Sequence, residues 1–187
     1  MSDLFHEDVP DSYILKVVQV MQLANWHTYQ VLTKRPERMY HLLNTKIFSA
    51  AREPHIWWGV SVENRQQGIP RVDYLRRTPV SVRFLSIEPL LESLGQIDLT
   101  DIGWVIVGGE SGRKARPMEK SWVIEIRDQC QELNIPFFFK QWGGRQKSKT
   151  GRELDGRTYD AVPQYRPRVV PSPESLRTKR AERELLQ

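Results

Sequence analysis

Five short apolar runs recur along the chain, and polar or charged residues end each of them. The runs cover residues 28–32, 56–60, 82–87, 104–107 and 136–139. Short continuous apolar runs are typical of strands that are buried on both faces, as in parallel sheets. Helix-like segments separate the runs, and strands that alternate with helices indicate repeated βα units. The pattern therefore predicts an α/β fold around a parallel sheet.

The intervening helices are predicted from apolar residues at helical spacing. The first helix is expected to begin with Asp11 or Ser12 as its cap, and the clearest apolar helix face follows the fourth run. That face consists of Trp122, Val123, Ile126, Cys130 and Leu133. These helices would supply one side of the core.

The same repetition predicts where a ligand would bind. In a parallel sheet the carboxyl ends of all strands meet at one rim. The residues that end the five runs are Thr33, Lys34, Arg35, Ser61, Glu63, Asn64, Glu88, Gly108, Gly109, Glu110, Ser111, Lys140 and Gln141. We expect them to surround one ligand-binding mouth in an incomplete parallel (β/α) barrel of about five βα units. A doubly wound open sheet is the alternative fold, and no catalytic residue can be assigned.

The glycine-rich stretch at residues 108–112 has two interpretations. Glycine lets the backbone approach a ligand closely, and Arg113, Lys114 and Arg116 just beyond it would help to hold an anion. The alternative is a tight turn between a strand and a helix with a solvated basic flank. The stretch matches neither a P-loop nor a dinucleotide-binding fingerprint.

Other rim residues have structural alternatives as well. Ser61 and Asn64 could hold a ribose or an amino acid through hydrogen bonds, or either could cap the helix that follows. Glu88 lies at a strand end directly before a proline, which favours a functional carboxylate. Lys140 is expected to act as a point charge for an anionic ligand.

Composition limits the classes of partner. The net charge of +5 and the sequence pI near 9.4 indicate either a nucleic-acid or nucleotide partner or a solvated basic surface. No apolar run reaches the roughly 18 residues that a membrane span needs, and residues 1–8 do not resemble a signal peptide. Cys130 is the single cysteine, which excludes an internal disulfide, and no metal-binding pattern is present. We therefore expect a cytoplasmic protein without a metal site.

Three regions are predicted along the chain. Residues 1–144 form the partial (β/α) barrel. Residues 145–162 form a hairpin extension around Asp155 and Gly156, a strong turn pair. Residues 163–187 are rich in proline and arginine and are expected to be a mobile basic tail, with a helix over residues 175–186.

Several long segments together resemble one known family. Residues 1–8, 31–36, 58–64, 83–90, 104–112, 115–118 and 137–143 resemble the phage "gene product thirty-seven" family, and the match covers about residues 1–163. This family occurs in phages and bacterial chromosomes, is uncharacterised, and resembles the radical S-adenosylmethionine barrel superfamily. The resemblance implies the carboxyl-terminal part of such a barrel.

The chain departs from that family in one place. Members carry three closely spaced N-terminal cysteines of the kind that hold a [4Fe–4S] cluster, and this chain lacks them. We therefore expect a fragment or remnant that is inactive alone and self-associates through open strand edges. The resemblance implies that a full-length form binds the cluster and cleaves S-adenosylmethionine. The alternative is a non-catalytic, phage-associated protein that binds nucleic acid through its basic rim and tail.

Overall fold

The computed structural model describes residues 3–165, 169–172 and 174–175. Its strands are β1 (Tyr29–Thr33), β2 (Ile56–Ser61), β3 (Val82–Ile87), β4 (Trp104–Gly108) and β5 (Phe137–Gln141). They form a five-stranded sheet in the order β1-β2-β3-β4-β5, and every neighbouring pair is parallel. The predicted α/β class and parallel sheet are confirmed.

The strand order in the sheet follows the order along the chain. A (β/α) barrel has this order throughout, whereas a doubly wound sheet reverses its order at a switch point. No reversal occurs among these five described strands. The carboxyl ends of all five strands therefore lie at one rim, as the sequence pattern predicts.

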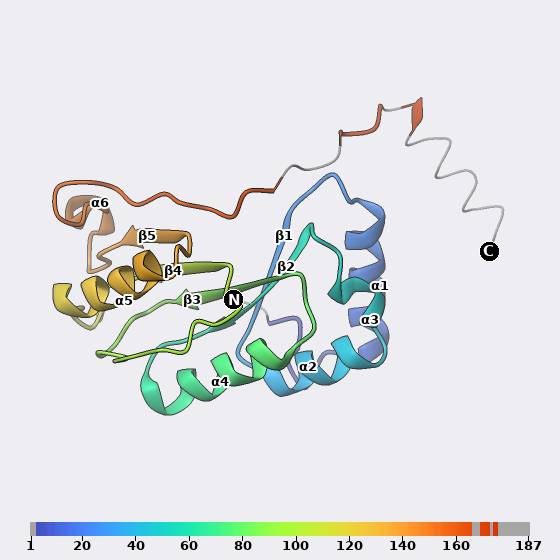
Figure 1. The fold of residues 1–187 in the computed structure, drawn as a ribbon, viewed down its shortest axis with the longest axis horizontal. Coiled ribbons are helices and arrows are strands. Elements are labelled where there is room, and N and C mark those ends of the chain that lie inside the picture. The colour runs from blue at the N-terminus through green and yellow to red at the C-terminus, as the bar shows by residue number, and fades with distance from the viewer. Residues whose placement is uncertain (1–2, 166–168, 173, 176–187) are drawn as a thin grey trace.

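The helices surround the sheet unevenly. They are α1 (Asp11–Leu23), α2 (Pro36–Asn44), α3 (Phe48–Ala51), α4 (Arg65–Arg77), α5 (Lys120–Glu132) and α6 (Lys147–Thr150). In Figure 1, α2 and α4 lie along one side of the sheet, and the chain that follows α6 runs along the opposite side. The sheet therefore has one face covered by helices and one face that a single extended segment crosses.

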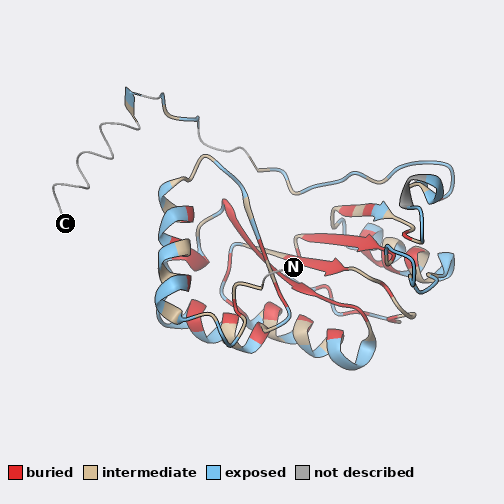
Figure 2. Ribbon diagram, turned by 180° about the vertical axis from the view of Figure 1, so that it is seen from behind, coloured by how far each residue is buried: buried red, intermediate tan, exposed pale blue. Residues whose placement is uncertain are grey.

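Alternate strand residues build the main core against the helices. Val31, Trp58, Leu85, Val107 and Phe139 contribute one side chain from each strand, and all belong to the same buried cluster. Figure 2 shows the strands and the inward sides of the helices as buried. Burying one such side chain contributes about 1.5–3 kcal/mol, so each of these five residues stabilises the packing of the sheet on the helices.

The opposite face carries a second, smaller cluster. Trp57, Phe84, Trp104 and Ile106 form it, and Tyr165 from the carboxyl-terminal segment packs against it. The Trp104 indole donates a hydrogen bond to the Ala161 carbonyl at 2.8 Å. The carboxyl-terminal segment thus covers the free face near the amino ends of the strands.

The two edges of the sheet differ. Along β5, the amide of Phe139 donates to the carbonyl of Tyr159 at 2.9 Å, and Phe138 pairs with Asp160 in an antiparallel bridge. A returning segment therefore covers the β5 edge. At the other end of the strand order, β1 pairs only with β2 among the described strands.

Two details of the predicted helices are wrong. Pro10 is the N-cap of α1, and the Asp11 carboxylate binds Arg38 and Lys46, each at 2.6 Å, instead of capping the helix. Leu133 lies just beyond α5 and is 53% exposed, because the helix ends one residue before it. Ion pairs with distant residues fix the Asp11 carboxylate, and the end of α5 leaves Leu133 outside the helix.

The extension after residue 144 contains the predicted turn. Asp155 and Gly156 both have positive φ, and Leu154 pairs with Arg157 in an antiparallel bridge across them. Most of the tail proposed for residues 163–187 lies outside the described residues, including nearly all of the helix expected at residues 175–186.

Candidate functional site

A groove of about 850 Å³ opens on the free face of the sheet. All five strands contribute to it. It is lined by Gln30, Leu32, Lys34, Ser61, Phe84, Ser86, Glu88, Pro89, Trp104, Ile106, Phe138 and Lys140. Side chains of a strand alternate between its two faces, so β1, β3, β4 and β5 each contribute residues two positions apart, whereas β2 contributes Ser61 alone.

The groove changes character along the strands. Toward the amino ends its floor is aromatic, with the Trp104 ring 5.9 Å from Phe84 and 6.1 Å from Phe138 between centroids. Gly59 makes room for this floor, because a Cβ there would lie 2.5 Å from the Phe84 ring. Toward the carboxyl ends the lining becomes hydroxylic and charged. Such a site can hold a ligand with one planar apolar part and one polar part.

Glu88 and Lys140 form the charged end of the groove. Their side chains make an ion pair at 3.0 Å, and the Ser86 hydroxyl donates to the Glu88 carboxylate at 3.4 Å. A Cβ on Gly108 would lie 2.5 Å from the nearer Glu88 oxygen, so this glycine makes room for the carboxylate. Glu88 and Gly108, both predicted to lie at the rim, are therefore in contact.

Glu63 lies behind the groove wall. Lys34 and Arg71 both pair with its carboxylate, and the distance from Arg71 is 2.7 Å. Burial alone raises the pKa of Glu63, but the hydrogen bonds and charges of Lys34 and Arg71 outweigh that effect and lower it. Glu63 is therefore ionised at neutral pH, and it holds Lys34 at the wall of the groove.

Three predicted rim residues are engaged in local structure. The Asp3 carboxylate accepts hydrogen bonds from the Thr33 hydroxyl at 2.7 Å and from the Arg35 guanidinium at 3.1 Å. Asn64 caps α4, because its side-chain oxygen accepts from the Gln67 amide at 2.8 Å. The capping alternative therefore describes Asn64, and Asp3 fastens the N-terminal segment to the end of β1.

The glycine-rich stretch packs against the loop after β5. A Cβ on Gly109 would lie 2.0 Å from the Trp142 carbonyl oxygen. Ser111 accepts a hydrogen bond from the Gln141 amide group at 2.7 Å. Arg116 binds Glu110 through two nitrogens, which lowers the pKa of Glu110 to about 2. The structure thus places Gly109, Glu110, Ser111 and Gln141 outside the groove lining.

Comparison with protein families gives one match. A model described as a protein of unknown function, DUF5131, matches residues 1–163. The chain belongs to the DUF5131 family. No curated protein and no solved structure matches it.

Sequence reasoning missed eight of the twelve residues that line the groove in this DUF5131 chain. It nominated Lys34, Ser61, Glu88 and Lys140, which line the groove, but it left out Phe84, Ser86 and Phe138. Phe84 and Ser86 lie four and two positions before Glu88, which directly follows β3, and Phe138 lies two positions before Lys140 in β5. Because residues i and i+2 of a strand share a face, a step of two back from Glu88 or Lys140 reaches Ser86 or Phe138. The same step from Thr33 reaches Val31 in the main core, so it does not by itself separate groove residues from core residues.

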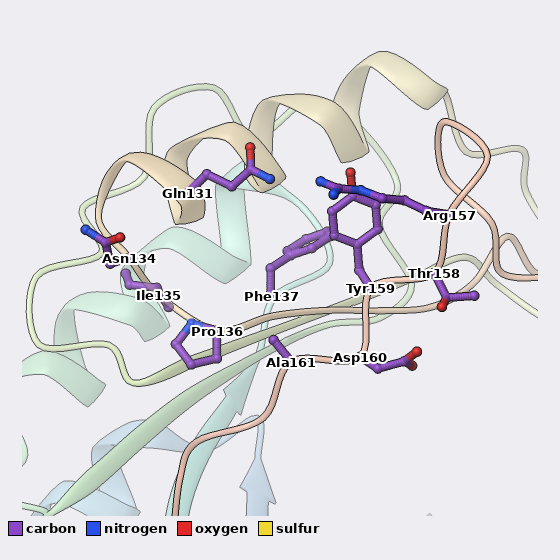
Figure 3. Close-up of a pocket in the computed structure, with 10 residues that line it drawn as sticks. All are labelled: Gln131, Asn134, Ile135, Pro136, Phe137, Arg157, Thr158, Tyr159, Asp160 and Ala161. Carbon is purple, nitrogen blue, oxygen red and sulfur yellow. The ribbon is translucent and has the colours of Figure 1, made fainter.

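A second hollow lies at the opposite end of β5. It has about 440 Å³ and is bordered by the end of α5, the start of β5 and residues 157–161. Figure 3 shows Arg157 alongside the ring of Tyr159, and the guanidinium carbon lies 4.4 Å from the ring centroid. The apolar wall of this hollow includes Pro136 and Phe137. The hollow lies away from the rim where the polar strand ends gather.

The described residues contain no group of three or more His, Cys, Asp or Glu side chains that could hold a metal ion. Cys130 is fully buried on α5, and burial raises the pKa of its thiol to about 12. None of the described helices is long and apolar enough to cross a membrane.

Proposed function

We propose that the groove binds a small nucleoside-type molecule, and that S-adenosylmethionine is this ligand. The observation that supports the proposal is the combination, in one groove, of an aromatic floor with hydroxyl groups and both signs of charge. S-adenosylmethionine has an adenine ring, ribose hydroxyls and a charged amino-acid end, so its parts match the parts of the groove. The resemblance to radical S-adenosylmethionine barrels selects it among nucleosides, and the five strands would be part of such a barrel.

Different residues of the groove would bind different parts of the ligand. Phe138, the half-buried aromatic residue of the groove lining, would stack against the adenine ring. The hydroxyls of Ser61 and Ser86 would bond the ribose. Glu88 would accept hydrogen bonds from the ligand ammonium. Lys140 would pair with its carboxylate, so the ion pair between the two side chains opens to admit a zwitterion.

The iron–sulfur cluster that the resemblance implies does not fit the residues of this chain. A cluster needs several thiolates, and Cys130 is the single cysteine, buried on α5 as a thiol. The proposal therefore ends at binding, and no reductive cleavage is assigned to these residues. From the resemblance we also propose that this is a phage- or prophage-type protein. S-adenosylmethionine would be used there together with a second substrate.

Titration calorimetry with S-adenosylmethionine tests the proposal, with Glu88→Gln and Glu110→Gln as a matched pair. Both glutamates end a strand of the sheet in the sequence pattern, but only Glu88 lines the groove. Losing a charge-assisted hydrogen bond costs about 1.5–3 kcal/mol, so Glu88→Gln should weaken binding by about 10- to 100-fold. Glu110→Gln should leave the affinity within about twofold of wild type.

A second variant tests the position of the Glu88 carboxylate separately from its charge. Gly108→Ala keeps every charged group but forces the Glu88 carboxylate to move, and it too should weaken binding. Circular dichroism and thermal melts check that each variant folds. Absence of binding by the wild-type chain, or equal losses from the Glu88 and Glu110 variants, would overturn the proposal.

A further inference from the structure

Two loops at the rim form one continuous surface. The loop after β4 and the loop after β5 are joined by backbone hydrogen bonds, from Gly144 to the Glu110 carbonyl at 2.7 Å and from Gly112 to the Gly144 carbonyl at 3.1 Å. Ser111 and Gly144 also form a parallel bridge. We call the surface of residues 109–116 and 142–152 the basic platform.

The basic platform has a strong excess of positive charge. Residues 142–152 contain four cationic residues and no acidic one, and one of the four, Arg152, pairs with Asp160. Arg113, Lys114, Arg145 and Lys149 are exposed, and none of the four forms an ion pair within the part of the chain that the structure describes. By contrast, Arg116 is paired with Glu110. The free cations thus gather on two loops that the backbone holds side by side.

The basic platform borders the groove. Gln141 ends β5, and its carbonyl accepts from the Gly109 amide at 2.9 Å, which ties both loops to the strand that carries Lys140 into the groove. A polyanion lying on the platform would therefore pass beside the charged end of the groove.

We propose that the basic platform binds the phosphate backbone of a single-stranded nucleic acid. Cationic side chains arranged beside an aromatic-floored groove are the recurring way in which proteins hold unpaired strands. A duplex would keep its bases stacked and paired, so an unpaired strand is the form that can present a base at the charged end of the groove, beside S-adenosylmethionine. The statement that a base reaches the groove rests on the proposed function, because a nucleotide of the bound strand would then be the second substrate used with S-adenosylmethionine. Docking on the platform itself does not depend on S-adenosylmethionine.

Fluorescence anisotropy with a labelled oligonucleotide of about 20 nucleotides, as DNA and as RNA, tests the proposal. Two double variants each remove two charges from the platform, Arg113→Gln with Lys114→Gln and Arg145→Gln with Lys149→Gln. The matched control is Lys16→Gln with Arg52→Gln, which removes two exposed charges from α1 and from the residue after α3.

The expected effects follow from counterion release. Each lost phosphate contact lowers the slope of log K against log salt by about 0.7 for a single strand, which is about fivefold in affinity at 0.1 M salt. Each platform variant should therefore bind about 25-fold more weakly than wild type, with a slope smaller by about 1.4. The control should stay within about twofold.

Three results would overturn the proposal. They are no binding by the wild-type chain at low salt, equal losses in the control and platform variants, and tighter binding to a duplex or to phosphatidylserine vesicles than to the single strand. Calorimetry with S-adenosylmethionine on the same variants keeps the two proposals apart. The platform variants should retain wild-type affinity for it, because none of the four substituted cations lines the groove.

Discussion

Replacing Gly109 by alanine tests the contact between the two rim loops. A Cβ at this position would lie 2.0 Å from the carbonyl oxygen of Trp142 and 2.7 Å from its carbonyl carbon. Both atoms belong to the backbone, so no side-chain rotation can relieve the overlap. The loops must separate by more than about 1 Å to reach an ordinary contact distance.

That separation breaks the hydrogen bonds that join the loops. The bond from Gly109 to the Gln141 carbonyl is 2.9 Å long, and the bond from Gly144 to the Glu110 carbonyl is 2.7 Å long. Adding about 1 Å takes both beyond hydrogen-bond range, at about 1 kcal/mol each. Overpacking adds about 1–3 kcal/mol, so the free energy of unfolding should fall by about 3–5 kcal/mol. For a chain of this length, that lowers Tm by roughly 6–20 °C.

Differential scanning calorimetry and urea denaturation followed by tryptophan fluorescence measure the effect. Gly103→Ala is the matched control, because its Cβ would lie 3.5 Å from the nearest atom, an ordinary contact. That substitution should change stability by less than about 1 kcal/mol. If Gly109→Ala melted within about 2 °C of wild type, the two loops would not be held together as described.

Two further predictions concern buried polar groups. Lys34 and Arg71 lower the pKa of Glu63 against the effect of burial, so its stabilising contribution is complete above its ordinary value of 4.5 and is lost as the pH falls through the lower folded value. Urea midpoints between about pH 3 and 7 should therefore fall with acidification, and less so in Glu63→Gln; parallel curves for the two proteins would contradict this. Cys130 should react with a thiol reagent at least about 100-fold faster in denaturant than in the native state, since burial removes access and raises its pKa to about 12. Comparable rates in both conditions would show that the α5 face opens readily.

The residues that the sequence pattern predicts include one end of the groove lining. Lys34, Ser61, Glu88 and Lys140 were nominated because they follow apolar runs, and all four line the groove. The aromatic floor was not found, because Phe84 and Phe138 lie inside apolar runs where a core residue and a groove residue look alike. Only the direction in which each side chain leaves its strand separates them.

The residues predicted around the glycine-rich stretch do not line the groove. Gly109 appeared to be suited to a ligand because glycine allows close approach, and the structure places the Trp142 carbonyl there. Glu110 is bound by Arg116, six residues further along. Sequence can show that a position needs a small residue or a charge, but it does not show which neighbour imposes that need.

The sequence by itself determined the strands, their parallel arrangement and the rim where their polar ends gather. These properties depend on local apolar patterning and on the alternation of strands with helices, which are written in consecutive residues. The tertiary structure alone decided which polar residues remain available to a ligand. Asp3 binds Thr33 from 30 positions away, and Arg71 binds Glu63 across the turn into α4. Such pairings depend on which surfaces the folded chain brings together, and no local pattern encodes them.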